Sequence, residues 1–197
     1  MPSNNRLVRA FIAIEIPAII YSEIAKIQGK LQRQCNCHAK WVVPDSIHLT
    51  LNFLGEVPPA TLKNAQQAML QAVIEQQPFE LTIDKLGAFP SLEYPRIIWI
   101  GLNDKLSKLK SLQIKLEQKL LHTGLALEER EFCPHLTLAR ISNEASYAEK
   151  RELSRALSAI TITSQKSFSV QTISLIQSRL TPRGTLYNTL FSAELRH

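Results

Sequence analysis

The chain has 197 residues, 45% of them hydrophobic, which suits one domain or two small lobes that share a core. Its 23 Lys and Arg residues outnumber its 17 Asp and Glu residues, and the net charge of +6 favours anionic partners such as nucleic acids. Three cysteines argue against a secreted disulfide framework, and Glu15 and Pro17 interrupt the early apolar run "AFIAIEIPAII" far short of a membrane span. We therefore expect a cytoplasmic protein with no signal segment and no membrane helix.

The first half of the chain predicts strands and helices in alternation. The apolar run "RAFIAIEI" before Pro17 is typical of a buried strand that leads into a helix. Apolar residues then recur at spacings of three and four after Pro59, so this proline is expected to open a helix that ends before Pro78. We expect strands at residues 9–16, 47–54, 79–89 and 95–102, and a first helix at residues 18–34.

The clearest helix of the second half lies within residues 104–124, where five leucines form one apolar face and Gly124 lies at the expected C-terminal cap. This stripe is typical of a core helix, and its members are Leu106, Leu109, Leu112, Leu116 and Leu120. Beyond it we expect a strand at residues 135–141, a helix at 145–158, and a hairpin of strands 168–180 and 185–195 across "TPRG".

The tetrapeptide "HLTL" occurs twice, at His48 in "SIHLTLNFLG" and at His135 in "FCPHLTLARI". Random order predicts only about 0.005 copies of it in a chain of this composition, so the repeat needs a cause. Each copy follows a predicted helix and precedes predicted strands, which indicates two related lobes that face each other across a groove. No low-complexity linker separates the lobes, so we expect one bilobal domain over residues 1–197.

Alternation along a strand places the histidine and the threonine of each tetrapeptide on one face and its leucines on the other. The four polar side chains are His48 and Thr50 in the first copy and His135 and Thr137 in the second. Two such pairs around one cavity suit hydrolysis of a phosphodiester. One neutral imidazole takes a proton from water, the other gives a proton to the departing oxygen, and the hydroxyls bind phosphate oxygens. This scheme demands no metal.

Two other interpretations of the tetrapeptides stand beside catalysis. A single H-x-T in a strand is more often an ordinary half-buried histidine next to a residue of high strand propensity, and only the second copy favours function. A non-catalytic RNA or nucleotide binder with the same fold is the rival of a different class, because intact motifs do not prove turnover.

The chain resembles the LigT-like RNA 2',3'-cyclic phosphodiesterases, also called 2'-5' RNA ligases, of the two-histidine phosphoesterase superfamily. The resemblance covers nearly the whole chain, and the paired H-x-T-x motifs are its specific mark. The blocks that carry it are "RAFIAIEIP", "WVVPDSIHLTLNFLGEV", "PFELTIDKLGAFPS", "PRIIWIGL", "EFCPHLTLAR" and "SLIQSRLTPRGTLYNTL".

The resemblance implies an α+β fold of two antiparallel sheets related by a pseudo-two-fold axis, with helices outside and the motifs in a central groove. It also implies opening of a terminal RNA 2',3'-cyclic phosphate to a 2'-phosphate without a metal or nucleotide cofactor. On this resemblance His48 is the proton donor, His135 is the proton acceptor, and Thr50 and Thr137 bind the phosphate. Arg140 matches a basic position of the family, but its odd offset from Thr137 requires a bend in the strand.

Further candidates carry weaker signals. Phe11 and Tyr187 could stack on a base, although either ring is about as often a core residue. Arg9, Arg179 and Arg183 could bind phosphates beyond the scissile one, although a solvated surface arginine is the commoner case.

The remaining motifs point away from metals and nucleotide cofactors. "CNCH" at Cys35–His38 lacks a second pair of ligands at a zinc-like spacing, and we interpret Cys133 as a buried, inert thiol. No G-x-x-x-x-G-K or G-x-G-x-x-G supports ATP or dinucleotide chemistry. The expected partners are RNA ends with a 2',3'-cyclic phosphate, with tRNA halves among the candidates and no obligate protein partner. Reversible 2'-5' ligation of such ends is the rival reaction at the same site.

Overall fold

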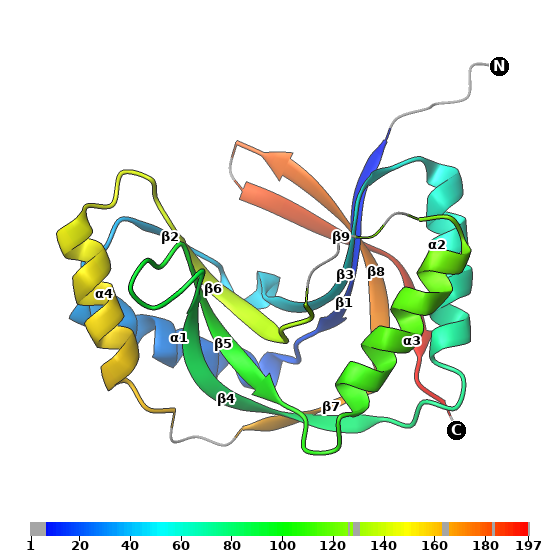
Figure 1. Cartoon of the computed structure of the whole chain (residues 1–197), viewed down its shortest axis with the longest axis horizontal. Helices are drawn as coiled ribbons and strands as arrows, with labels where there is room; N and C mark the ends of the chain where they lie inside the picture. The colour runs from blue at the N-terminus through cyan, green and yellow to red at the C-terminus, as the bar shows by residue number, and fades with distance from the viewer. Residues whose placement is uncertain (1–6, 126, 128–130, 163–165, 183, 197) are drawn as a thin grey trace.

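A curved antiparallel sheet with helices on its outside forms the framework of the chain (Figure 1). The computed structural model describes residues 7–125, 127, 131–162, 166–182 and 184–196. The helices are α1 (Ala18–Gln34), α2 (Pro59–Ala72), α3 (Lys108–His122) and α4 (Tyr147–Ala159), with a short 3-10 turn, η1 (Pro44–Ser46). The strands are β1 (Val8–Glu15), β2 (Ala39–Trp41), β3 (His48–Val57), β4 (Phe79–Phe89), β5 (Ile97–Asn103), β6 (His135–Ile141), β7 (Ser167–Val170), β8 (Thr172–Thr181) and β9 (Gly184–Glu194). The α+β class expected from the sequence is confirmed.

Two lobes meet in the middle of the sheet, whose strand order is β7-β4-β5-β6-β3-β1-β8-β9. The strands from β7 to β6 form one lobe, with β2 paired to β6, and the strands from β3 to β9 form the other. β3 and β6 pair through Leu49 and Leu136, and in the described residues their pairing extends no further. The two expected sheets are therefore halves of one hydrogen-bonded sheet, and the divergence of β3 from β6 opens a cavity that both strands line.

Two helices cross from the lobe of the preceding strand to the other lobe (Figure 1). α1 follows β1 but packs beside α4 on the lobe of β6, where the Gln28 side-chain amide donates to the Leu138 carbonyl at 3.1 Å. α3 follows β5 but packs with α2 on the lobe of β3. Each half of the sheet is thus covered in part by a helix that enters from the opposite half.

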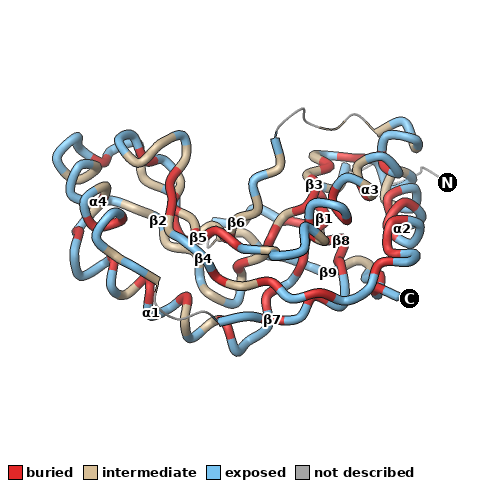
Figure 2. The backbone as a smooth tube through the Cα atoms, turned by 60° about the horizontal axis from the view of Figure 1, so that its bottom comes forward, coloured by how far each residue is buried: buried red, intermediate tan, exposed pale blue. Residues whose placement is uncertain are grey.

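The hydrophobic core is continuous across the two lobes and contains the apolar faces of all four helices. In α1 the buried residues Ile20, Ile24, Ile27 and Leu31 recur at helical spacing. Figure 2 shows buried residues running through the strands, while the helices expose much of their outer surface. In α3, four members of the expected leucine stripe are buried as predicted, namely Leu109, Leu112, Leu116 and Leu120.

The helices and strands differ from the sequence-based expectations at three places described below. Leu106 is not part of the α3 stripe: it is 73% exposed, because the Asp104 carboxylate accepts the main-chain N–H groups of Leu106 and Leu109 and the helix begins only at Lys108. The expected strand at residues 168–180 is two strands, β7 and β8, which lie in different lobes. β2 was not expected.

Candidate active site

The two "HLTL" copies lie on neighbouring antiparallel strands, β3 and β6. Because the strands run in opposite directions about the pair Leu49 and Leu136, His48 lies on the side of Thr137, and Thr50 lies on the side of His135. The leucines of both copies are buried, whereas the histidines and threonines are half-buried. The sequence-predicted alternation is thus present in both strands.

All four polar side chains line one cavity of about 180 Å³. Its other lining residues come from the neighbouring segments and are Val42, Ser46, Ile47, Arg140 and Tyr187. This volume admits a small group such as a phosphate rather than a whole nucleotide, since sites for larger ligands span about 300–1,000 Å³.

Both imidazoles are held through the same ring nitrogen. His48 Nδ1 lies 3.1 Å from the Ser46 carbonyl oxygen, and His135 Nδ1 lies 2.7 Å from the Cys133 carbonyl oxygen. A carbonyl oxygen only accepts hydrogen bonds, so each Nδ1 carries its proton and donates. Nε2 of each ring is therefore the nitrogen that is free to gain or lose a proton.

Burial lowers the pKa of both histidines below the usual value, because the charged ring loses solvation. For His48 the Ser46 carbonyl and the Glu15 carboxylate oppose this effect and raise the pKa, and Glu15 is its direct cross-strand partner. For His135 the Arg140 guanidinium lowers the pKa further. Glu15 thus favours a cationic ring at His48, and Arg140 favours a neutral ring at His135, where the Cys133 carbonyl acts in the opposite direction and raises the pKa.

Aromatic side chains from other strands of the sheet pack against each imidazole. Phe11 stacks on His48 with ring centroids 4.6 Å apart, and the Tyr187 ring meets His48 edge-on at 5.0 Å. Phe89 meets His135 edge-on at 5.0 Å. These contacts fix the ring planes, and they explain the burial that shifts the pKa values.

The sequence did not single out the aromatic residues beside His135. The Trp99 ring lies 6.3 Å from His135 and 5.2 Å from Phe89. It also lies flat against the backbone of Gly87, where an added Cβ would come within 2.2 Å of the indole. "GAFPS", within a block that marks the family resemblance, carries both Gly87 and Phe89, but only the β4–β5 register shows that they face the indole.

Of the two alternatives for Phe11, a ring that stacks on a base or a core residue, the structure fits the core residue. It is only 3% exposed, because His48, Phe53 and Tyr187 cover it. Its position supports His48 instead. Tyr187 is 41% exposed and lines the cavity, so its ring is accessible to a ligand.

Arg140 reaches the cavity through the bend that its offset requires. Opposite β5, Thr137 pairs with Trp99 and Ala139 pairs with Ile98, so Leu138 is an extra residue in β6. Such a β-bulge reverses the alternation, and Arg140 therefore lies on the same face as Thr137. Arg9 and Arg179 lie instead at a separate, larger cavity, and Arg183 lies outside the described residues.

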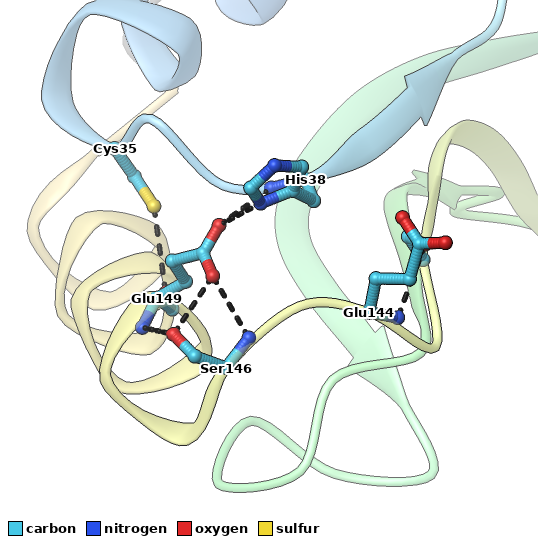
Figure 3. Close-up of polar contacts among 6 residues, drawn as sticks. Cys35, His38, Glu144, Ser146 and Glu149 are labelled. Carbon is cyan, nitrogen blue, oxygen red and sulfur yellow. Dashed lines mark hydrogen bonds and ion pairs between the residues drawn. The ribbon is translucent and has the colours of Figure 1, made fainter.

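Cys35 and His38, from the "CNCH" segment, contact Glu149 near the N-terminus of α4 (Figure 3). The Glu149 carboxylate accepts the N–H and the hydroxyl of Ser146 and contacts His38, which lowers the pKa of Glu149 to about 2. The Cys35 thiol donates to the Glu149 carbonyl at 3.5 Å. Among the described residues, no group of three or more His, Cys, Asp or Glu side chains is placed to hold a metal ion.

Cys133 is exposed rather than buried, in contrast to the expectation from the sequence. Its carbonyl oxygen, and not its thiol, contacts His135. Partial loss of solvation at the sulfur and the nearby Glu131 carboxylate raise the pKa of the thiol, which disfavours the thiolate that a nucleophile requires. In the part of the chain that the structure describes, no helix is long and apolar enough to cross a membrane.

Comparison with known proteins matches both halves of the chain to one family. The family described as LigT-like phosphoesterase matches residues 14–99 and again residues 100–187. An RNA 2',3'-cyclic phosphodiesterase of Methanocaldococcus jannaschii is 32% identical over 92% of this chain and 98% of its own length, and one of Methanothermobacter thermautotrophicus is 29% identical over 93% and 96%.

A solved structure of E. coli LigT with 3'-AMP has 28% identity and a TM-score of 0.76, covering 97% of this chain and 99% of that one. A Thermus thermophilus protein has 25% identity and a TM-score of 0.75, with coverage of 95% and 98%. The double match agrees with the repeated tetrapeptide and with the two lobes. This chain therefore belongs to the LigT-like phosphoesterase family.

Proposed function

We propose that this protein hydrolyses the terminal 2',3'-cyclic phosphate of RNA to a 2'-phosphate. The observation that carries the proposal is the pairing of two H-x-T segments about one small cavity, with Nε2 of both imidazoles free for proton transfer. Support for the substrate comes from the relatives that are named RNA 2',3'-cyclic phosphodiesterases and from the net charge of +6.

In the proposed reaction His135 acts as the base and His48 as the acid. Neutral His135 takes a proton from water through Nε2, and the oxygen of that water forms a bond to phosphorus. The bond from phosphorus to the 3'-oxygen breaks, and His48 gives its Nε2 proton to that oxygen. Arg140 favours a neutral His135, and Glu15 favours a protonated His48, which supports this assignment over the reverse one.

Thr50, Thr137 and Arg140 are proposed to bind the phosphate. The two hydroxyls lie on the cavity face beside the histidines, where each can donate to a non-bridging oxygen. The Arg140 guanidinium adds a positive charge for the negative charge that builds up on these oxygens. All the proton transfers and phosphate contacts come from side chains, so the scheme requires no metal and no nucleotide cofactor.

With a 5'-hydroxyl in place of water as the nucleophile, the same site would join an RNA 2',3'-cyclic phosphate to that end through a 2'-5' linkage, with the 3'-oxygen again as the leaving group, and tRNA halves are candidate substrates. Incubation at high concentrations of both ends distinguishes the two reactions. We expect hydrolysis to dominate, and joined product at saturation would establish ligation as a second activity.

The deciding experiment mixes the purified protein with an oligoribonucleotide that ends in a 2',3'-cyclic phosphate, in the presence of EDTA. We expect quantitative conversion to a 2'-phosphate end, identified by mass and by comparison with synthetic 2'- and 3'-phosphate standards. Binding without conversion would instead establish the non-catalytic binder. Loss of turnover on addition of EDTA would refute the metal-free scheme.

A further inference from the structure

A cavity of about 700 Å³ lies between the start of β1 and the end of β8, away from the histidines. We call it the interstrand cavity; it is lined by residues 7–9, 56, 59 and 177–181. The two strands pair only as far as Ala10 and Gln177, while β8 continues with β9 to Thr181. Figure 1 shows the β8–β9 hairpin leaning away from the start of β1, and the cavity occupies this separation.

Two arginines from the two separating strands, Arg9 and Arg179, line the interstrand cavity. Within the described residues, neither guanidinium forms an ion pair with a carboxylate. Arg9 instead lies over the Phe53 ring, 5.0 Å from its centroid. One carboxylate, that of Glu56, also lines the cavity and opposes an anion there. Two arginines against one carboxylate leave a net positive charge among the described residues that line the cavity.

Ser178 adds an unpartnered polar group to the same wall. The residue is only 7% exposed, and among the described residues Oγ has no hydrogen-bond partner. Buried hydroxyls are normally satisfied, because an unpaired one costs free energy. Four residues earlier in the same strand, the buried Ser174 Oγ does bond to Ser192 Oγ, at 3.0 Å. Because Oγ has almost no accessible surface, a ligand oxygen in the cavity could become its partner only after the serine side chain rotates.

The interstrand cavity is connected to the catalytic cavity by contiguous side chains. The Arg9 guanidinium lies 5.0 Å from the centroid of the Phe53 ring. The centroid of the Phe11 ring lies 6.5 Å from that of Phe53 and 4.6 Å from that of His48. Ser178 lies opposite Tyr187, whose ring is 5.0 Å from His48. On another side of His48, a cavity contains Glu15 and Asp45, which repel a polyanion. An RNA chain that leaves the catalytic cavity is therefore favoured toward Arg9 and Arg179.

We propose that the interstrand cavity binds a backbone phosphate of a single-stranded RNA whose cyclic end lies between His48 and His135. Arg9 and Arg179 supply the charge, and the Ser178 hydroxyl donates to a phosphate oxygen. This inference rests on the proposed function for the position of the RNA end. It makes the protein selective for oligonucleotides over cyclic mononucleotides, which have no second phosphate.

The test measures two quantities for each variant: kcat/KM, and the Kd for a cyclic-ended oligoribonucleotide, obtained by fluorescence anisotropy in a His135→Ala background so that the ligand is not hydrolysed. In Arg179→Gln we expect oligonucleotide binding to weaken about tenfold, as loss of a charge-assisted hydrogen bond does. The slope of log Kd against log salt concentration should fall by about 0.7, the contribution of one phosphate in a single strand. Turnover of 2',3'-cyclic AMP should stay within about twofold of the wild-type rate.

Arg196→Gln is the matched control, since Arg196 is an exposed arginine whose guanidinium contacts Glu194 instead. It removes the same charge, so a similar loss in this variant would show a general charge effect and overturn the site. An equal loss on the mononucleotide in Arg179→Gln would also overturn it. Because Kd is measured without turnover, a protein that binds but does not hydrolyse RNA refutes the proposed function and still tests the cavity.

The serine pair separates a binding role from a structural one. Ser178→Ala removes a hydroxyl without a partner, so the Tm should not fall, yet oligonucleotide binding should weaken. Ser174→Ala removes a bonded hydroxyl, so the Tm should fall while binding is kept. The opposite result for either variant would overturn the role of Ser178.

Two further changes identify the ligand. Glu56→Gln removes the opposing carboxylate, and we expect tighter oligonucleotide binding. Oligonucleotides with one neutral methylphosphonate linkage should bind the wild type more weakly when that linkage is the contacted one, and Arg179→Gln should abolish this difference. Losses that are the same in both proteins at every linkage would show that no phosphate meets Arg179.

Discussion

Leu49 and Leu136 occupy the same position in the two "HLTL" tetrapeptides, and they pair with each other across β3 and β6. The local two-fold relation between the lobes therefore passes through this pair. It places one imidazole and one hydroxyl of each copy about the same cavity. What breaks the symmetry is the surroundings, with Glu15 beside His48 and Arg140 beside His135.

Replacement of either histidine tests the proposed proton transfers. His48→Ala and His135→Ala should each lower turnover of a cyclic-ended RNA by about 100-fold or more, the usual contribution of a general acid or base. Their circular dichroism spectra should match the wild type, because both side chains line a cavity rather than the core. A properly folded variant with a near-normal rate would contradict the proposal. Thr50→Ala and Thr137→Ala should cost roughly 1.5–3 kcal/mol of transition-state stabilisation each.

The assignment of acid and base has its own test, which uses a substrate with sulfur in place of the bridging 3'-oxygen. A thiolate leaves without protonation, so this substrate should largely restore His48→Ala and not His135→Ala, in which water still needs a base. Single-turnover rates measure the rescue. Rescue of His135→Ala instead would reverse the roles, and rescue of neither would mean that the histidines do more than transfer protons.

The pH dependence of kcat/KM should be bell-shaped, with its maximum on the acid side of the usual histidine pKa. Rate rises as His135 loses its proton and falls as His48 loses its proton, and burial lowers both pKa values. Glu15→Gln removes a group that raises the pKa of His48, so the alkaline limb should move to lower pH. Arg140→Gln removes a charge that lowers the pKa of His135, so the acid limb should move to higher pH. A profile with one limb would contradict the paired mechanism.

Gly87 should be intolerant of any side chain. Gly87→Ala places a Cβ within 2.2 Å of the Trp99 indole, so we expect a loss of about 1–3 kcal/mol in the free energy of unfolding and a lower rate, because Trp99 packs near His135. Gly29→Ala is the control, since a Cβ there meets only the end of the Arg33 side chain at 3.4 Å. In the interior of α1 it should stabilise by roughly 0.5–1 kcal/mol. Urea denaturation measures both changes.

The two lobes should unfold together. α1 and α3 each cover the lobe opposite to the strand that precedes them, so neither half of the sheet is fully covered without residues of the other. Calorimetry and urea curves followed by fluorescence and circular dichroism should give one coincident transition. Two separate transitions would show independent domains and contradict the single domain over residues 1–197.

Much of this structure could be predicted from the sequence where one local signal decided the outcome. The helix at Ala18–Gln34 and the strand at Phe79–Phe89 were predicted with their exact bounds, because proline and apolar periodicity mark them. The break at Gln171 could not be, since apolar residues continue on both sides and only the pairing partners assign β7 and β8 to different lobes. Likewise the capping by Asp104, which excludes Leu106 from α3, depends on backbone geometry.

The residues of the candidate site could likewise be predicted only where a local signal in the sequence marks them. The repeat identified His48, Thr50, His135 and Thr137 because all four lie within the duplicated letters. Glu15, Phe89 and Trp99 lie far from those letters, and the register of β1, β4 and β5 brings them to the imidazoles. No local pattern encodes such a register, so a single sequence could not identify these residues.

The connector between β7 of one lobe and β8 of the other is a single residue, Gln171. A connector of one residue has almost no slack, and the helices that cross between the lobes add further tethers. The mouth of the catalytic cavity is therefore set when the chain folds, and a ligand meets hydrogen-bond donors that already stand in place. For a hydrolytic enzyme this arrangement has an advantage, because His48 and His135 are only half-buried and bulk solvent, the source of the second reactant, can reach the reacting end.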